Sequence, residues 1–308
     1  MQRTSPLGTH TTPVYHKEQF FEKNSKKIVH SYIHGDKYDD FPLLLHQHDF
    51  YEINLVIEGR GVHYFNDQTI NTRTGDLFII PPHITHGYTN DHDLKIFHTL
   101  LAPSFFTFYP TLESLTGFKS LFDIEPSLRS AVQYNFLHLS RLQREEIFKD
   151  IHSCLNYSFY NIFDFNIQSA IIFQMICKFC KYYTSFTIEP NNHRTEKNYI
   201  NMMIYAMEYI QKNFANNITI DKIANDLFMS KTTFQRYFKQ VANMSPINYL
   251  TQQRINASKD MLTSTNKTIA VIAVTCGFFD GSHFIRNFKQ NEGISPTEYR
   301  KKYTNTNN

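Results

Sequence analysis

The chain contains one internal repeat, in which residues 230–249 match residues 280–299 at an offset of fifty positions. The matched positions are Phe234 and Phe284, Arg236 and Arg286, Phe238 and Phe288, Lys239 and Lys289, Gln240 and Gln290, the Ser-Pro pairs that begin at Ser245 and Ser295, and Tyr249 and Tyr299. A self-match at a fixed period indicates a duplicated structural unit. Two copies are too few for a solenoid, so we expect two similar small modules side by side.

Each copy of the repeat begins a helix that follows a shorter apolar helix. Thr219 and Thr268 are the predicted N-caps of the shorter helices, and Ser230 and Asp280 are the predicted N-caps inside the repeat. A short helix, a tight turn and a helix with a polar face form a helix-turn-helix. Residues 246–263 predict a long helix between the two modules, and Ser-Pro-Thr-Glu at 295–298 predicts a capping box for a last short helix.

Charge is distributed unevenly along the chain. The formal net charge is +3, but residues 199–308 hold 13 Lys and Arg against 7 Asp and Glu, a net charge of +6. The remaining residues hold 18 basic and 21 acidic side chains, a net charge of −3. A basic C-terminal third on a mildly acidic body is typical of a polyanion-binding module, although an ordinary solvated basic face gives the same count.

The first part of the chain predicts β structure in a globular protein. Hydrophobic residues make up 41% of the chain and charged residues 19%, which excludes a disordered chain. The N-terminus lacks an apolar secretion segment and no stretch is long enough to span a bilayer, so we expect a cytoplasmic protein with no membrane partner. Short apolar runs between residues 43 and 101, interrupted at Gly59, Gly61 and Pro81-Pro82, predict strands of a sandwich or a jelly-roll barrel.

Three histidines and a glutamate stand out in this β region. Their positions resemble the two motifs of the cupin family. HxH-x3-E-x6-G matches His46, His48, Glu52 and Gly59, and G-x5-P-x-G-x2-H-x3-N matches Gly75, Pro81, His86 and Asn90. Two positions depart from the pattern, because Asp40 and His83 stand where the motifs usually carry glycine. The resemblance covers about sixty residues and implies a cupin-like barrel.

The histidine motif has three interpretations. In metal-dependent cupins these four side chains hold one ion, and imidazoles with a carboxylate suit Fe, Mn, Ni or Zn. Cupin-like sensors instead bind a small polar molecule, and we prefer this interpretation, with no metal and no other cofactor. The predicted lining residues are then His46, His48, Glu52, His86, Tyr51 and Tyr88. The third interpretation is a structural cluster that is hydrogen-bonded and binds nothing.

The middle of the chain changes to helical periodicity. Apolar residues recur at helical spacing in two stretches: Leu142, Ile147, Ile151 and Leu155, then Ile167, Ile171, Met175 and Phe179. We expect two helices that pack either on their own β-domain or, for the second helix, against another copy of the chain. Cys177 and Cys180 form a C-x-x-C late in an apolar run, which favours buried thiols over redox or zinc chemistry.

The segment 269–300 reads IAVIAVTCGFFDGSHFIRNFKQNEGISPTEYR. Its Ile-Ala, Cys-Gly-Phe, Asp-x-Ser, Phe-x-Arg-x-Phe-Lys, Gly-x-Ser-Pro and Tyr-Arg elements resemble the signature of the AraC/XylS family of bacterial transcription regulators. The resemblance covers about 100 residues, and a cupin-like sensing domain is that family's common N-terminal partner. It implies base contacts by Thr232, Gln235, Arg236, Ser282, Ile285 and Arg286, and phosphate contacts by Ser230, Lys231, Lys239 and Lys289.

The chemistry of the repeat agrees with this resemblance. Two recognition helices joined by a long helix can enter successive major grooves about 34 Å apart on one face of a duplex. Arginine can read guanine with two donors, and glutamine can read adenine.

The expected fold is therefore α+β with two domains. We predict a cupin-like sensing domain at 1–140, a helical dimerisation or packing segment at 141–185, a linker at 186–197 and a DNA-binding domain with two helix-turn-helix units at 198–308. The expected function is a non-enzymatic transcription regulator, an activator, with double-stranded DNA, RNA polymerase, a small effector and a second copy as partners. Many family members respond to carbohydrates. The alternatives are a metal-dependent cupin enzyme or metal sensor fused to a DNA-binding domain, and a regulator controlled by expression level or a protein partner.

Overall fold

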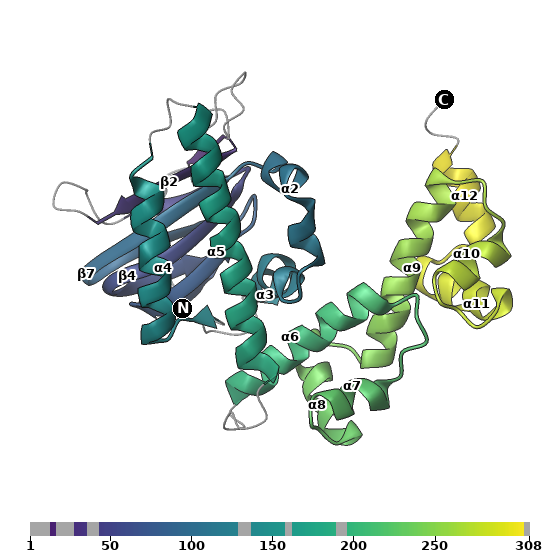
Figure 1. The fold of residues 1–308 in the computed structure, drawn as a ribbon. Helices are drawn as coiled ribbons and strands as arrows, with labels where there is room; N and C mark the ends of the chain where they lie inside the picture. The colour runs from purple at the N-terminus through teal and green to yellow at the C-terminus, as the bar shows by residue number, and fades with distance from the viewer. Residues whose placement is uncertain are drawn as a thin grey trace, which may run out of the picture. The chain divides into compact units, whose positions relative to one another are not determined.

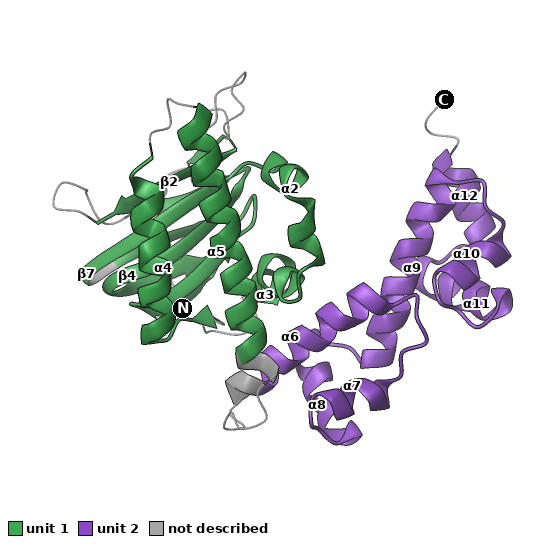
Figure 2. Ribbon diagram, in the orientation of Figure 1, with its two compact units in different colours: residues 1–186 green, residues 187–308 purple. Residues whose placement is uncertain are grey.

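The computed structural model describes residues 13–16, 28–35, 43–128, 137–157, 162–188 and 196–304. The chain forms two compact units, Met1–Phe186 and Thr187–Asn308 (Figure 2). The first unit is β-rich and the second is helical, which confirms the two-domain α+β prediction. Of the predicted linker at 186–197, residues 189–195 lie outside the described residues, as does Asp40 of the first cupin motif.

The first unit is built on a sheet whose two longest strands are β4 and β7. The strands are β1 (Val14–Tyr15), β2 (Val29–His34), β3 (Leu43–His48), β4 (Tyr51–Phe65), β5 (Gln68–Arg73), β6 (Asp76–Ile80), β7 (His86–Leu101) and β8 (Leu137–His138). Strand β4 pairs with β7 along most of both lengths, and the main path runs β1-β3-β7-β4-β6-β8. Among the described residues this pairing does not close into a ring, so the cupin-like sheet is open.

Strands β4 and β7 change partners at their middles. The first half of β4 pairs with β6 and the second half with β5, while β3 and β2 pair with the two ends of β7. The register shifts between Val56 and Gly61. A Cβ on Gly59 would lie 2.1 Å from the Asp93 carbonyl oxygen, and one on Gly61 would lie 2.1 Å from the Thr89 carbonyl oxygen. Only glycine permits this close approach, which allows the two strands to bend together.

Helices cover one face of the sheet. They are α2 (Ser104–Phe108), a 3-10 helix (Pro110–Ser114), a π-helix (Ser120–Ile124), α3 (Glu125–Leu128), α4 (Arg141–Leu155) and α5 (Ile162–Ile188). Helices α4 and α5 run side by side across the sheet (Figure 1). Helix α5 packs Ile172, Met175, Ile176 and Phe179 against Ile53, Leu55, Phe97 and Thr99 of the strands. This contact matches the alternative in which the helix packs on its own β-domain.

The apolar stripes of α4 and α5 are only partly buried. Ile147, Ile151, Met175 and Phe179 are buried, whereas Leu142 is 78% exposed. Exposed apolar side chains on the two helices also include Phe148, Leu155, Ile162, Phe163 and Ile167. Cys180 is buried and Cys177 half-buried, both inside α5 and both free thiols, as expected for core cysteines rather than a redox pair.

The second unit consists of seven helices among its described residues. They are α6 (Glu196–Asn213), α7 (Ile220–Asp226), α8 (Lys231–Ala242), α9 (Pro246–Ser264), α10 (Ile269–Thr275), α11 (Gly281–Glu292) and α12 (Pro296–Thr304). The predicted N-cap side chains of Thr219, Ser230, Thr268 and Asp280, and that of Ser245 before α9, each accept a hydrogen bond from the first turn of their helix. The caps confirm both helix-turn-helix units.

Each module has its own core, and α9 contributes to both. Phe234 and Phe238 are fully buried in the first module, and Phe284 and Phe288 in the second. The second core also contains Ile255 and Leu262 of α9. The turn at Gly277 touches the first module, because a Cβ there would lie 2.7 Å from the Phe214 carbonyl oxygen. Within the described residues, no helix is both long and apolar enough to cross a membrane.

Candidate nucleic-acid interface and buried histidine cluster

The two repeat helices α8 and α11 present polar faces to solvent. Their phenylalanines anchor the opposite face, so 3.6-residue periodicity places the remaining residues outward. All ten predicted DNA contacts are exposed: Ser230, Lys231, Thr232, Gln235, Arg236 and Lys239 in the first module, and Ser282, Ile285, Arg286 and Lys289 in the second. The structure therefore brings each predicted set together on one helix.

The exposed cationic side chains of α8 and α11 differ in their contacts within the protein. Lys231 forms an ion pair with Asp221 at 2.8 Å, so part of its charge is already offset. The guanidinium of Arg236 lies 4.7 Å from the centre of the Tyr237 ring, and that ring stacks on Tyr199 of α6 at 4.1 Å. This contact restricts the rotamers of Arg236. The second module lacks a counterpart of this contact, because Asn287 follows Arg286 where Tyr237 follows Arg236.

The turn before each recognition helix also differs between modules. In the first module, Met229 is buried and Ser230 caps α8 directly. In the second module, Phe278 is buried and one further residue, Phe279, precedes the cap Asp280. Phe279 is 91% exposed. The two duplicated modules therefore present different surfaces, at this turn as well as at the base-reading positions.

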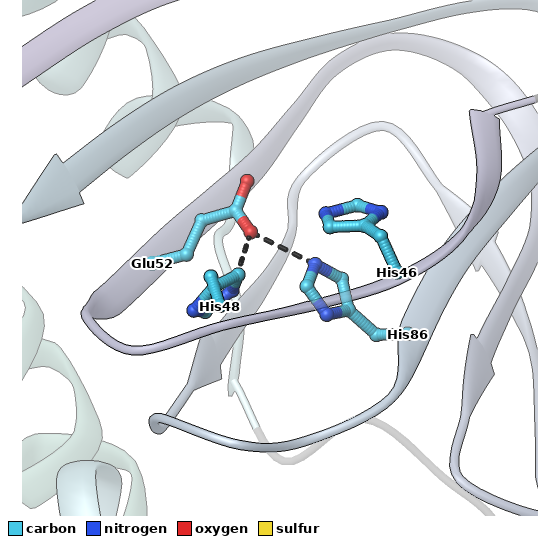
Figure 3. Close-up of side chains that lie close together, drawn as sticks. All are labelled: His46, His48, Glu52 and His86. Atoms are coloured by element: carbon cyan, nitrogen blue, oxygen red, sulfur yellow. Dashed lines mark hydrogen bonds and ion pairs between the residues drawn. The ribbon is translucent and has the colours of Figure 1, made fainter. Parts of the chain in front are cut away.

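The cupin-like motif residues of the first unit converge inside the sheet (Figure 3). One possible ligand atom from each of His46, His48, Glu52 and His86 lies within 4.8 Å of the others. Glu52 Oε2 lies 3.1 Å from His48 Nε2 and 2.8 Å from His86 Nε2. His48, Glu52 and His86 are buried, and His46 is half-buried. Strand β3 provides two of these residues, and β4 and β7 provide one each.

Backbone carbonyls restrict the tautomers of two rings. His48 Nδ1 lies 2.7 Å from the Phe50 carbonyl oxygen, and His86 Nδ1 lies 3.3 Å from the Ile84 carbonyl oxygen. A carbonyl only accepts, so Nδ1 must carry the proton in each ring. A neutral ring then directs the Nε2 lone pair at Glu52. The arrangement needs either an additional proton or a cation between these atoms.

Burial and hydrogen bonding shift the pKa of Glu52 in opposite directions. Burial raises its pKa, but hydrogen bonds from His48, His86 and His98 outweigh burial, so the pKa lies well below its ordinary value. Burial lowers the pKa of His86, and the neighbouring Glu52 offsets this only in part. The hydrogen bonds that His48 and His86 donate to Glu52 from Nε2 require a second proton on each ring, and burial disfavours that proton on His86.

Sequence reasoning missed His98 and Asn54. His98 Nδ1 donates to Glu52 Oε1 at 2.6 Å, and Asn54 is the register partner of His98. The amide of Asn54 connects Glu52 with Tyr88. Its nitrogen donates to Glu52 Oε1 (3.0 Å), and its oxygen accepts from the Tyr88 hydroxyl (3.1 Å). Asn54 shares the strand parity of Glu52 and could have been found from that alternation. His98 required the register of β4 and β7.

The two predicted tyrosines occupy different places. Tyr88 is fully buried and stacks on His63 with ring centres 4.3 Å apart. Its hydroxyl donates to Asn54, which in turn donates to Glu52. Tyr51 has the opposite strand parity to Glu52 and lines a separate hollow of about 240 Å³ with Phe106 and Phe122. The structure therefore brings the histidines, Glu52 and Tyr88 together, and places Tyr51 elsewhere.

Comparison with known proteins gives matches for both units. The family described as AraC-like ligand binding domain matches residues 29–156, and the family described as helix-turn-helix domain matches residues 223–302. The HTH-type transcriptional activator RhaR of Mannheimia succiniciproducens is 23% identical over 262 residues, covering 85% of this chain and 88% of that protein. RhaS of Klebsiella pneumoniae, also an HTH-type transcriptional activator, is 24% identical over 262 residues, covering 83% and 86%.

Among solved structures, the C-terminal domain of AraT, a response regulator from Geobacillus stearothermophilus, is 32% identical over 33% of this chain and 84% of that chain, with a TM-score of 0.32.

Proposed function

The chain belongs to the AraC family of transcription regulators, and from that premise we propose that it is a homodimeric activator whose effector binds at the buried histidine cluster. It is a ligand-responsive DNA-binding regulator, with a ligand-binding unit and two helix-turn-helix modules in one chain. The observation that carries the DNA-binding part of the proposal is the matched pair of recognition helices, each with an arginine exposed beside polar neighbours. We infer that the histidine cluster binds its ligand without converting it.

The two modules read different bases. Thr232, Gln235 and Arg236 face the groove from α8, and Ser282, Ile285 and Arg286 face it from α11. Gln235 suits adenine, whereas Ile285 offers only an apolar contact, as with the thymine methyl group. Ser230, Lys231, Lys239 and Lys289 contact phosphates and fix the register. One monomer therefore prefers an asymmetric site.

The effector is a small polar molecule of the carbohydrate class. Imidazole and carboxylate groups can donate to and accept from several hydroxyl groups at once. The half-buried His46 ring is the most accessible member of the cluster and stacks edge-on against Tyr15 of β1 at 5.2 Å. An effector that displaces these contacts changes the packing of β1 on β3, which is where we place the first structural response.

Homodimerisation involves the outer face of α4 and α5. Phe163 is 75% exposed and Ile162 54% exposed at the start of α5, and Leu142 is 78% exposed at the start of α4. Exposed apolar side chains concentrated on one helix pair suit a contact with a second copy. RNA polymerase is the partner through which the DNA-bound dimer activates transcription.

The test combines DNA binding with effector screening. Thermal shift of the purified chain against sugars and polar metabolites should identify a compound that raises the melting temperature, and His48→Ala should abolish the shift. The same compound should change affinity for the chain's own promoter region in a gel-shift assay. A compound that stabilises wild type and His48→Ala equally would place the effector elsewhere. Light scattering on Phe163→Ser should report monomers if α5 forms the dimer contact.

A second candidate, a metal sensor, is favoured by the tautomers of His48 and His86. Metal-binding histidines commonly donate one ring N–H to a backbone carbonyl and use the other nitrogen as ligand. His48 and His86 have this arrangement, and His46 and Glu52 would complete a four-ligand set. A divalent ion there would act as the effector itself. Elemental analysis of protein purified without a metal column decides: a stoichiometric ion that His48→Ala lacks supports the sensor, and its absence supports the organic effector.

A further inference from the structure

A basic hollow lies in the first unit, apart from the histidine cluster. It has a volume of about 570 Å³ and is open to solvent, and its basic side chains are Arg60, Arg73, His92, His138 and Arg144. None of these residues belongs to the group formed by His46, His48, Glu52 and His86. The hollow concentrates cations in a part of the chain whose formal net charge is negative.

Strand register places three of these basic side chains in one row. Arg60 of β4 is the direct partner of Arg73 on β5 and of His92 on β7. Direct partners in antiparallel strands point to the same face with Cβ atoms about 4.5–5.5 Å apart, and like charges in such a pair are destabilising. The fold therefore keeps two arginines directly opposite each other, which is unfavourable for like charges.

A second pair of basic side chains approaches the same hollow from β8 and α4. A Cβ built on Gly75 would lie 3.1 Å from Arg144 Nη1 and 3.1 Å from His138 Cε1, so both side chains converge above this glycine. Arg144 donates to the Thr74 carbonyl oxygen at 3.0 Å through one nitrogen, which orients the guanidinium and leaves other donors available.

Nearby carboxylates do not neutralise the three arginines. Asp76 Oδ1 lies 2.7 Å from His138 Nδ1, so this carboxylate is used by the histidine. Glu58 pairs with Lys95 at 2.8 Å. Among the residues whose side chains the structure describes, none forms a carboxylate pair with Arg60, Arg73 or Arg144. About three positive charges thus remain available around a concave surface.

We propose that this hollow is a second ligand site, which binds a small molecule carrying phosphate groups. Guanidinium forks match phosphate oxygens with paired, charge-assisted hydrogen bonds, and three of them suit an anion with two or more charges. Bound phosphate offsets the repulsion between Arg60 and Arg73. The volume of about 570 Å³ is within the usual range for small-molecule sites, about 300–1,000 Å³.

The test measures pyrophosphate binding to the full-length chain by calorimetry and by thermal shift at constant ionic strength. Wild type should bind pyrophosphate, and Arg60→Gln and Arg73→Gln should each weaken binding about tenfold or more, because a charge-assisted bond is lost. Arg73→Lys should bind with intermediate affinity, since it keeps the charge without the fork. Lys181→Gln on α5 is the matched control, because this exposed residue does not line the hollow.

A separate measurement does not depend on the ligand. Without anions that bind the site, Arg60→Gln and Arg73→Gln should melt at a higher temperature than wild type, because each removes the like-charge pair. Equal stabilisation of wild type and both variants by pyrophosphate would overturn the proposal. Tighter binding of malonate or succinate than of pyrophosphate would also overturn it. So would a short DNA duplex that displaces pyrophosphate to an extent that increases with the number of phosphates in the duplex.

Discussion

Arg286 and Lys289 lie three residues apart on the exposed face of α11, and their replacement by alanine separates base reading from phosphate contact. An arginine with both donors on a guanine is worth about 1–3 kcal/mol of discrimination. At about 1.4 kcal/mol per tenfold change, Arg286→Ala should weaken binding to the preferred site about 5- to 150-fold. Binding to a randomised duplex should change little.

Lys289→Ala should behave differently, because a phosphate contact carries no sequence information. Its affinity loss should be similar on all duplexes, and the slope of log Kobs against log salt should fall by about 0.9. Fluorescence anisotropy against a library of single-base variants, at several salt concentrations, measures both quantities. Both side chains are exposed, so the melting temperature of each variant should equal that of wild type and serves as the folding control.

The matched residue in the first module sharpens the comparison. Arg236 is held against Tyr237, so it loses less rotamer freedom on binding than Arg286 does. Arg236→Ala should therefore cost at least as much affinity as Arg286→Ala, at a different base position. The base-reading assignment is refuted if Arg286→Ala loses affinity equally on every duplex and also lowers the salt slope.

Three other perturbations address the fold. Gly59→Ala should lower the free energy of unfolding by more than about 2 kcal/mol in chemical denaturation, because φ is +78° and the new Cβ would lie 2.1 Å from a carbonyl oxygen. Hydrogen bonds from Tyr182 and Lys178 lower the pKa of Glu146. The stability that this carboxylate confers should be complete above its ordinary pKa of 4.5 and should be lost as pH falls through the lowered pKa. The difference in the free energy of unfolding between wild type and Glu146→Gln, measured across pH, should show this loss. Cys276 should resist thiol reagents at pH 8, because burial raises its pKa to about 11.

Each of these expectations has a control in the chain. Gly281 at the start of α11 has open space around it, so Gly281→Ala should not reproduce the loss at Gly59. A stability difference between wild type and Glu146→Gln that stays constant down to pH 3 would contradict the pKa argument. Labelling of Cys276 at the rate of an unfolded thiol would contradict its burial.

Local patterns were sufficient to predict the second unit. Ser230 and Asp280 accept hydrogen bonds from residues three positions later, and Phe234 and Phe238 share a helix face four residues apart. Such relations depend on a single turn of backbone, so they can be identified in the chain before its partners are known. Because the segment is repeated, the same helix caps and apolar positions could be recognised in both modules. The outward position of Arg236 and Arg286 followed from the same periodicity.

The first unit is different, because its site depends on which strands are neighbours. His46, His48 and Glu52 were identified from a local motif, but His98 reaches Glu52 from 46 residues away. The arginine row of Arg60 and Arg73 exists only because β4 and β5 pair in that register.

The sequence by itself thus determined the two modules, their caps and their exposed arginines, since helices bring together residues that are close in the chain. The tertiary structure alone decided that His98 joins the histidine cluster, whereas strand alternation already separates Tyr51 from Glu52 and places Asn54 beside it. The tertiary structure also decided that three arginines meet at one hollow. Strand pairing is non-local, and a shift of one residue in register would turn a strand side chain such as His98, Arg60 or Arg73 to the other face of the sheet.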